Sequence, residues 1–351
     1  VSYAAPPAAG ESASVVGLQE NASFRSNLGL VNLGADAIAL RVALYGPSGE
    51  LLAELPDRTL PPFGWTQIDR PLLGLAEAGR AVVTRVTGSG AFSAYAALID
   101  QTTSAGAFVA AVDASPGDLD RLVPVVVDAT GLGGTHYRTE LTLANLTAAS
   151  LPLVLTFTTS SAGSGSVGVV LGPGEQRIVP DAVAYLRAQG LVIPPGNAEG
   201  SLRVWGGVPA TSFAALARTY TPGPAGGTYG VAYAGVTASE SAGSGAWVYG
   251  LREDAASRSN LALVNRGDSG DSIALTLTFF DESGAPLGTP ESLALSPGEW
   301  RQIGRPLAAL GASAGFVRIE RTAGTSRFVA YGVRNDAVTS DGSLLPMDVA
   351  P

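Results

Sequence analysis

The sequence predicts an all-β protein made of three tandem antiparallel β-sandwich modules of about 110–120 residues each, with minimal helix. Two observations carry this prediction. Three short sequence windows recur in the same order in three copies, and within each copy apolar residues alternate with other residues. The length of 351 residues agrees, because it suits two or three domains of roughly 150 residues.

The repeat is clearest in the window RSNLGLVN at residues 25–32, which returns as RSNLALVN at residues 258–265. A diverged copy, RTELTLAN, stands at residues 138–145, so the copies are 138 − 25 = 113 and 258 − 138 = 120 residues apart. Two further windows recur in the same order. They are LPPFGWTQIDRPL at 60–72, LGPGE at 171–175 and LSPGEWRQIGRPL at 295–307, then FSAY at 92–95, FAAL at 213–216 and FVAY at 328–331.

Each copy has the pattern of short strands joined by tight turns. Ile38, Leu40, Val42 and Leu44 alternate with smaller or polar residues, and the following GPSG at residues 46–49 predicts a hairpin turn. Later strands of the first copy are expected at about residues 81–86, 92–99 and 107–113. Seven or eight such strands in each copy are typical of an antiparallel two-sheet sandwich.

A short connection with one helical turn is expected at residues 71–79 and 306–315. The middle copy lengthens this connection to residues 181–200. There we expect Asp181 to cap a short helix that ends near Gly190.

The repeat also sets the predicted domain boundaries. An N-terminal extension at residues 1–10 is followed by modules at residues 11–116, 117–237 and 238–351. The stretch ASESAGSG at residues 238–245 is expected to be a linker. We therefore expect three slim modules in series, each with its own core.

The shared pattern is Arg-[Ser/Thr]-x-Leu-x-Leu-x-Asn, then Leu-x-Pro-Gly, then a Phe-x-Ala-Tyr-like strand. With this pattern the modules resemble the immunoglobulin-like (Ig-like) or fibronectin-III-like β-sandwich repeats of secreted bacterial surface proteins. The resemblance extends over nearly the whole chain after residue 11, and it implies a stalk, spacer or adhesive module. The chain has no cysteine, so the Cys–Trp–Cys core of immunoglobulin domains is missing and the strand topology stays open.

Composition argues against several classes of partner. The net charge is −9, and all 21 cationic side chains are Arg without a basic cluster, which argues against nucleic acid and anionic membrane surfaces. No apolar run approaches the roughly 18 residues that span a bilayer, so no membrane insertion is expected. Val1 and the small residues after it match a mature chain after signal-peptide removal, which predicts a secreted, extracellular or cell-surface location.

We expect no enzyme activity. His136 is the only histidine, and the other copies have Ser23 and Ala256 at the same place, so a Ser–His–Asp triad is not expected. The acidic residues lie mainly in turns, where carboxylates bond to the local backbone. Slim modules would also offer no cleft for the paired carboxylates of a glycosidase.

No cofactor is expected, since no His/Cys cluster is present. Ca²⁺ is a weak option, because Asp268 and Asp271, like Asp118 and Asp120, place carboxylates near turns. Neither pair follows a specific motif such as the EF-hand loop, so solvated turn acids are the simpler interpretation.

The aromatic residues divide into two groups. Trp65 and Trp300 occupy the same place in the repeat and are expected in the core, as are the Tyr residues of the FSAY and FVAY windows. Trp205 and Trp247 lie outside the pattern and are the candidates for exposed interface residues.

The leading functional prediction is a subunit of an extracellular structural assembly, a filament, sheath or surface layer built from copies of this chain. Residues 1–10, with the interface candidates Val1 and Tyr3, lie outside the repeat and could add a strand to a neighbouring copy. Covalent linkage by sortase or isopeptide chemistry needs Lys, which is absent, so the polymer would be non-covalent. The run at residues 344–349 is expected to be the last strand of its own module.

The alternative is a cell-surface adhesin or carbohydrate-binding spacer with surface glycans as partners. An exposed Trp205 or Trp247 beside polar side chains favours this alternative, whereas a continuous apolar end patch favours self-assembly.

Overall fold

The structure is a computed structural model, and it describes residues 12–112, 117–131, 134–160 and 163–350. Within these ranges the chain forms 24 β-strands and one α-helix, which confirms the prediction of an all-β protein. None of the helices in the described ranges is long and apolar enough to cross a membrane.

The strands fall into three consecutive sets of eight. The first set contains β1 (Ser12–Gln19), β2 (Phe24–Asn32), β3 (Ile38–Tyr45), β4 (Leu51–Leu60), β5 (Trp65–Asp69), β6 (Ala78–Thr87), β7 (Phe92–Asp100) and β8 (Gly106–Ala110). The second set contains β9 (Asp120–Thr130), β10 (His136–Asn145), β11 (Leu151–Thr159), β12 (Gly163–Leu171), β13 (Gln176–Val179), β14 (Ala198–Trp205), β15 (Phe213–Pro222) and β16 (Thr228–Ala234). The third set contains β17 (Gly245–Arg252), β18 (Ser257–Asn265), β19 (Ile273–Asp281), β20 (Pro286–Leu295), β21 (Trp300–Gly304), β22 (Ala314–Ala323), β23 (Phe328–Asp336) and β24 (Gly342–Val349).

The strands pair in the same order in all three sets. The first set has one sheet in the order β1-β6-β3-β4 and another in the order β5-β2-β7-β8. The second set repeats these orders as β9-β14-β11-β12 and β13-β10-β15-β16, and the third as β17-β22-β19-β20 and β21-β18-β23-β24. Pairing of β9 with β10, and of β17 with β24, joins the two halves of the later sets into eight-stranded sheets.

This order differs from that of an immunoglobulin constant domain. There the first two strands are neighbours in one sheet, whereas β1 and β2 lie in different sheets. The Ig-like part of the fold prediction is therefore not confirmed.

Several local predictions are confirmed. The side chain of Asp181 accepts a hydrogen bond from the N–H of Ala184 at 2.9 Å and caps α1 (Ala182–Ala188). Gly190 then adopts a φ of 100°, a left-handed conformation that suits glycine after a helix. A 3₁₀ turn at Ala308–Leu310 occupies the predicted connection, and the final strand β24 pairs with β23 of its own set.

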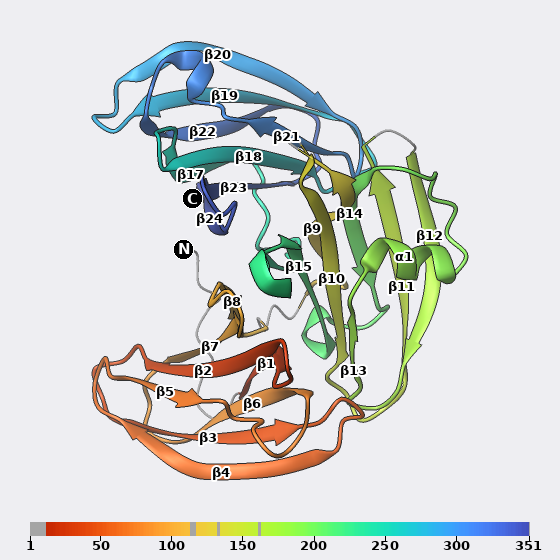
Figure 1. Ribbon diagram of the computed structural model, residues 1–351, viewed down its shortest axis with the longest axis vertical. Coiled ribbons are helices and arrows are strands. Elements are labelled where there is room, and N and C mark those ends of the chain that lie inside the picture. Colours follow the sequence, from red (N-terminus) through yellow and green to blue (C-terminus); the bar gives the residue numbers. More distant parts are fainter. Residues whose placement is uncertain (1–11, 113–116, 132–133, 161–162, 351) are drawn as a thin grey trace.

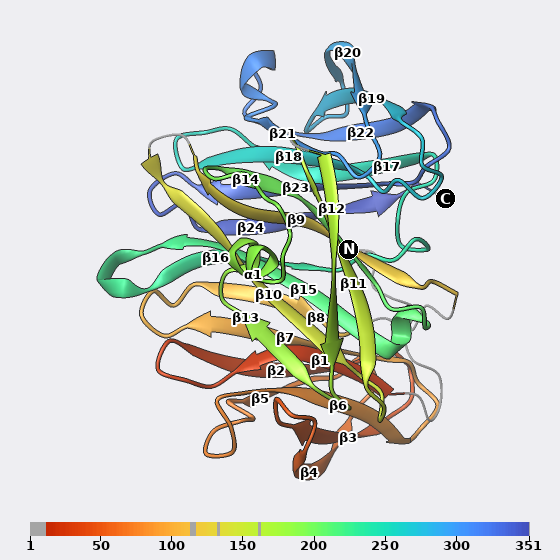
Figure 2. The ribbon, with the colours of Figure 1, turned by 90° about the vertical axis from the view of Figure 1, so that its right-hand side faces the viewer.

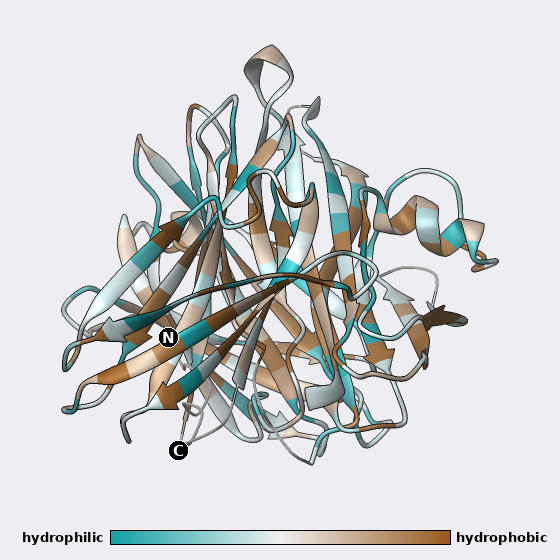
Figure 3. Cartoon of the chain, turned by 90° about the horizontal axis from the view of Figure 1, so that it is seen from below, coloured by the Kyte–Doolittle hydropathy of each residue, from teal (hydrophilic) through white to brown (hydrophobic). Residues whose placement is uncertain are grey.

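Alternating side chains build the cores. Burial alternates along the whole of β7, as a period of two predicts. Leu28 and Leu30 of β2 meet Leu40 and Val42 of β3 in one hydrophobic cluster between the two sheets of the first set. Figure 3 shows this alternation as apolar and polar bands along the strands.

The three sets pack against one another, so the expectation of slim modules in series is wrong. Figure 1 shows them along an arc, with the first set at the bottom and the third at the top, and Figure 2 shows the second set between the other two. In β16, Ala232 belongs to the core of the first set, whereas Val231 and Tyr233 belong to the core of the third. The expectation fails because apolar side chains on the outer faces of the sheets are shared between sets.

The stretch at residues 238–245, which the sequence predicts to be a linker, is packed against its neighbours. Ser241 and Ala242 are buried, and Ala242 forms an isolated antiparallel bridge with Phe328. The hydroxyl of Ser241 donates to the carbonyl of Thr237 at 2.7 Å. Glycine and serine here allow a packed turn between the second and third sets.

Candidate functional site

Each set has two outer faces, which we name by their strands. The first-strand face is the outward side of the sheet that contains β1, β9 or β17. The second-strand face is the outward side of the sheet that contains β2, β10 or β18. β1 and β17 each contain a β-bulge, where the register of strand pairing shifts. The register also shifts between β9 and β14. These three shifts mark equivalent positions on the three first-strand faces.

The first-strand face of the first set covers the second-strand face of the second set. Val16, at the bulge of β1, is buried with Ala144 and Ala214 of β10 and β15. Gly17 adopts a φ of 75°, which favours glycine, and a Cβ there would lie 2.9 Å from the end of the Leu216 side chain, so the two sets pack closely at this point.

Gln176 locks this contact with polar bonds. Its Oε1 accepts from the N–H of Gly17 at 2.9 Å, and its Nε2 donates to the carbonyl of Gly79 at 2.8 Å. Nearby, Gln19 donates to Glu140 at 2.9 Å, and burial raises the pKa of the Glu140 carboxyl. These hydrogen bonds satisfy polar groups that the contact between the two sets removes from water.

The first-strand face of the second set covers the second-strand face of the third in the same way. Leu122, Val125 and Val127 of β9 belong to the hydrophobic core of the third set. The other sheet of the second set adds Tyr233 of β16, which meets Tyr331 edge-on with ring centroids 5.2 Å apart. Both rings are buried, and burial raises the pKa of each phenol.

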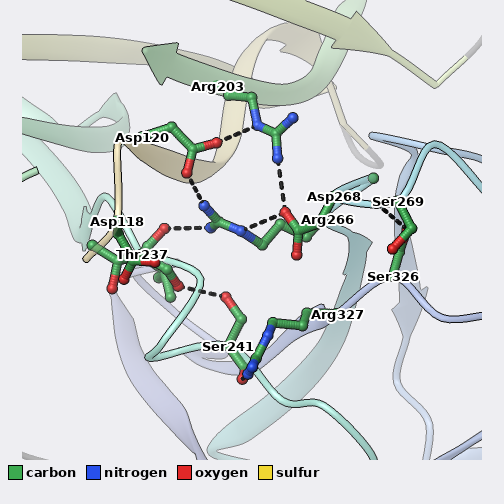
Figure 4. Close-up of polar contacts among 12 residues, drawn as sticks. Asp118, Asp120, Arg203, Thr237, Ser241, Arg266, Asp268, Ser269, Ser326 and Arg327 are labelled. Carbon is green, nitrogen blue, oxygen red and sulfur yellow. Dashed lines mark hydrogen bonds and ion pairs between the residues drawn. The ribbon is translucent and has the colours of Figure 1, made fainter. Parts of the chain in front are cut away.

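A charged cluster closes the edge of this second contact (Figure 4). The fully buried Arg266 of the third set pairs with Asp120 of the second set and with Asp268 at 2.9 Å. Arg203 of β14 pairs with the same two carboxylates, at 2.8 Å from Asp268. The cluster also includes the carbonyl of Val236, which accepts from Arg266 at 2.6 Å.

In both contacts, therefore, the first-strand face of one set packs on the second-strand face of the next set along the chain. A contact of this head-to-tail kind leaves one face of each kind uncovered at the two ends of the series. Here the uncovered faces are the second-strand face of the first set and the first-strand face of the third set.

The uncovered first-strand face of the third set carries an aromatic cluster. Trp247 and Tyr249 of β17 stack with ring centroids 6.0 Å apart, and Phe280 of β19 stacks on Phe316 of β22 at 5.2 Å. The guanidinium of Arg318 lies over the ring of Trp247 at 5.8 Å. We call Trp247, Tyr249, Phe280 and Phe316 the third-set aromatic cluster.

Two of these four rings stand where the first set has residues buried against the second set. By strand register, Trp247 and Tyr249 correspond to Ser14 and Val16, and Phe280 and Phe316 correspond to Tyr45 and Arg80. Arg80 and Val16 are buried in the first set, whereas Tyr249 is 47% exposed. The third set therefore has an exposed Tyr249 and a half-buried Phe316 at the places of the buried Val16 and Arg80.

The uncovered second-strand face of the first set is aromatic too. Trp65 donates from its indole N–H to the hydroxyl of Tyr95 at 2.9 Å, and the Tyr95 ring stacks on Phe108 at 5.0 Å. Phe63, with a φ of 54°, is 71% exposed beside them. We call Phe63, Trp65, Tyr95 and Phe108 the first-set aromatic platform.

The structure corrects one aromatic prediction and bears out another. Trp300 is buried as expected, but its repeat equivalent Trp65 is 56% exposed, because no other set covers it. Trp205 is exposed as expected, and Trp247 is half-buried within the aromatic cluster. The interface candidates Val1 and Tyr3 lie outside the described residues.

The carboxylates weighed for Ca²⁺ are bonded to protein donors. Asp120 and Asp268 do come together, but Arg203 and Arg266 pair with both of them. Asp271 accepts from the hydroxyls and backbone N–H groups of two residues that follow β22, Thr325 and Ser326. Within the described ranges no group of three or more His, Cys, Asp or Glu side chains is placed to hold a metal.

His136 lies between two polar neighbours on the β9–β10 pair. Its Nε2 is 2.9 Å from Asp128, and its Nδ1 is 3.2 Å from the hydroxyl of Thr130. A carboxylate, an imidazole and a hydroxyl lie in a row, but the two ring nitrogens are reversed relative to a catalytic triad, in which the carboxylate bonds to Nδ1. The row follows from strand pairing, which places His136 opposite Thr130 and Arg138 opposite Asp128.

A cavity of about 760 Å³ lies where β8, β16 and β24 converge. The expectation of no sizeable cleft is therefore wrong, because the three sets surround a common space. The lining is mainly alanine, valine and other apolar residues, and Glu240 is its one carboxylate among the described residues. That carboxylate accepts from the hydroxyl and the N–H of Thr237, both at 2.7 Å.

Sequence reasoning missed most of the two aromatic surfaces. The sequence did not predict Tyr249, Phe280 or Phe316 as surface residues, because large apolar residues in strands usually belong to a core. The available signal was a comparison of the copies position by position. Ser14 and Val16 become Trp247 and Tyr249 at equivalent places.

A scan against protein-family models finds no match for this chain, and a search of curated proteins finds none. Among solved structures, the chain is similar to a Thermotoga maritima protein, 1070, at 15% identity over 31% of this chain and 96% of that one, with a TM-score of 0.25. It is also similar to the N-terminal CBM22-1–CBM22-2 tandem domain of Paenibacillus barcinonensis Xyn10C, at 12% identity over 96% and 83% of the two chains, with a TM-score of 0.18. Similarities at these TM-scores carry no argument about fold or function.

Proposed function

We propose that the three strand sets are three copies of one β-sandwich module, and that the chain is a non-enzymatic subunit of an extracellular, non-covalent homopolymer such as a filament, sheath or surface layer. The repeated sequence windows and the repeated pairing order support three modules. The extracellular location rests on the resemblance to secreted surface repeats. Module boundaries near residues 116 and 237 belong to the same proposal.

One observation carries the assembly. Twice within the chain, the first-strand face of one set packs on the second-strand face of the next set. One second-strand face and one first-strand face stay uncovered at the two ends, and both carry aromatic rings. Head-to-tail contacts form a ring when the rotation between units closes and a filament when it does not. A contiguous exposed apolar patch at each end is the usual sign of a protein–protein surface.

The alternative is an adhesin or carbohydrate-binding spacer. The third-set aromatic cluster favours it as well, because the exposed Tyr249 ring can stack on a sugar ring and the nearby Arg318 and Glu320 can bond to its hydroxyls. The two functions differ in what should bind Tyr249: a second copy of the chain or a glycan.

The test is light scattering and negative-stain electron microscopy of the purified chain over a range of concentrations. The variant Tyr249→Asp places a charge on the uncovered face, and Trp205→Asp is a matched control at an exposed aromatic of the second set. We expect regular assemblies from the unmodified chain and from Trp205→Asp, and at least a tenfold higher concentration requirement for Tyr249→Asp.

A monomer at every concentration would overturn the assembly, as would equal assembly by Tyr249→Asp. A monomer that binds a glycan array, and loses that binding in Tyr249→Asp, would support the adhesin alternative.

A further inference from the structure

The geometry points to a specific joint between copies: the third-set aromatic cluster of one copy seats on the first-set aromatic platform of the next, in the register of the internal contacts. This inference rests on the proposed function and names its contact surface. The occupant is a second copy of this chain, because the same two kinds of face already bind each other twice within the chain.

The bulge sets the centre of the joint. In the contact of the first two sets, the bulge residue Val16 packs on Ala144. By the repeat, Tyr249 is equivalent to Val16 and Val31 is equivalent to Ala144. The joint therefore places Tyr249 of one copy on Val31 of the next.

The platform is flat where the bulge would meet it. A Cβ on Gly29 would lie 2.2 Å from the Tyr95 ring, so glycine lets that ring lie directly on β2. The hydrogen bond from Trp65 and the stack on Phe108 hold the ring in this orientation. An aromatic surface held in this way suits stacking by Trp247 and Tyr249.

The turn that contains Phe63 indicates a larger separation between the two faces in the joint than in the internal contacts. At the place of Phe63, the second and third sets have Gly174 and Gly298, all three with positive φ. A Cβ on Gly174 would lie 2.9 Å from Gly49 of the first set, and one on Gly298 would lie 2.7 Å from Thr158. The Phe63 side chain cannot fit such a gap, so it displaces the partner turn and packs against the ring of Phe316, the equivalent of Arg80.

Cysteine cross-linking tests this register, because the natural chain contains no cysteine. The variants Val31→Cys and Tyr249→Cys are purified separately, mixed and mildly oxidised. A mixture of Tyr249→Cys with Val192→Cys is the matched control, because Val192 is 93% exposed and lies in the loop between α1 and β14, outside the strands that form the two faces. A chain with Val16→Cys and Ala144→Cys provides the internal positive control.

We expect a reductant-sensitive dimer from the Val31→Cys and Tyr249→Cys mixture, at least fivefold above the control mixture and above either variant alone. Equal dimer from either variant alone would overturn the inference, because it indicates contact between like faces. No excess over the control would also overturn it. If the unmodified chain still assembles in that case, the proposed function stands with a different joint, whereas a monomeric unmodified chain removes both.

Discussion

The Trp–Tyr pairs of the first and third sets share their sequence position and their hydrogen bond but not their environment. Trp65 donates to Tyr95 at 2.9 Å, and Trp300 donates to Tyr331 at 3.0 Å. Trp65 is 56% exposed, whereas Trp300 is 6% exposed. The third-set pair is covered by the second set, and Ser160 of that set donates to the carbonyl of Trp300 at 3.2 Å.

The comparison shows that one local structure can be a core element or a surface, depending only on what packs on it. Gln176 occupies the same repeat position in the second set, and it is buried against the first set. The first-set pair is thus exposed at the place where the other two sets are covered by a neighbouring set. The following predictions test this difference, from the largest expected effect to the smallest.

The largest difference is expected between Trp300→Ala and Trp65→Ala. Removing the buried ring leaves a cavity between the second and third sets and should lower the free energy of unfolding by about 3–5 kcal/mol. The exposed ring should cost about 1 kcal/mol or less. Urea unfolding followed by circular dichroism measures both, and equal losses would contradict the comparison.

A second difference is expected at the residue that follows the repeated windows at residues 25–32 and 258–265. Arg266 is buried among carboxylates, whereas its repeat equivalent Leu33 is exposed. Arg266→Ala should lower the free energy of unfolding by roughly 3 kcal/mol, because it leaves Asp120 and Asp268 with only Arg203. Leu33→Ala should cost about 0.5 kcal/mol or less. A larger effect at Leu33, measured in the same unfolding assay, would show that this face is covered in solution.

A smaller difference is expected from removing one hydroxyl. Tyr331→Phe leaves the buried indole N–H of Trp300 without its acceptor, at a cost of about 1–2 kcal/mol. Tyr95→Phe lets the half-exposed Trp65 bond to water instead, at about 0.5 kcal/mol or less. Thermal unfolding of the two single variants compares the two costs, which should become equal only if the first-set platform is buried by a partner.

The smallest predicted effect depends on pH. Hydrogen bonds from Ser326 and Thr325 hold the pKa of the Asp271 carboxyl well below its usual value of 3.8. A depressed folded pKa stabilises the protein above pH 3.8 and loses that contribution as the pH falls below it. Asp271→Asn should therefore lower the melting temperature at pH 7, and the gap should narrow below about pH 4.

The matched control is the first-set aspartate Asp36. The backbone carbonyl of Asp36 accepts from Asn32, just as that of Asp271 accepts from Asn265. The Asp36 carboxylate has one long hydrogen bond from Ser89, at 3.3 Å, so Asp36→Asn should shift the melting temperature less. A larger pH-dependent shift from Asp36→Asn would contradict this account.

Much of the fold could be predicted because it is local. The period of two in residues 38–44, the Asp181 cap and the turn at Gly190 depend on near neighbours, and each formed as predicted. The strand order could not be predicted, because alternation says which face of a strand is buried but not which strand lies beside it. The two uncovered aromatic faces were predicted only in part, through Trp247, because burial on an outer face depends on a set that is distant in the sequence.

The sequence by itself determined three copies of one pattern of short strands, with the caps and turns that join them, because these follow from side-chain period and backbone conformation. Only the tertiary structure decided which copies of an equivalent residue are covered. Trp65, Gln176 and Trp300 hold the same place in the repeat, and their burial differs because the head-to-tail packing ends at the first set. The residue pattern of one strand does not show whether another set packs on it. The first and third sets are the two ends of the packed series, and the uncovered aromatic faces lie there.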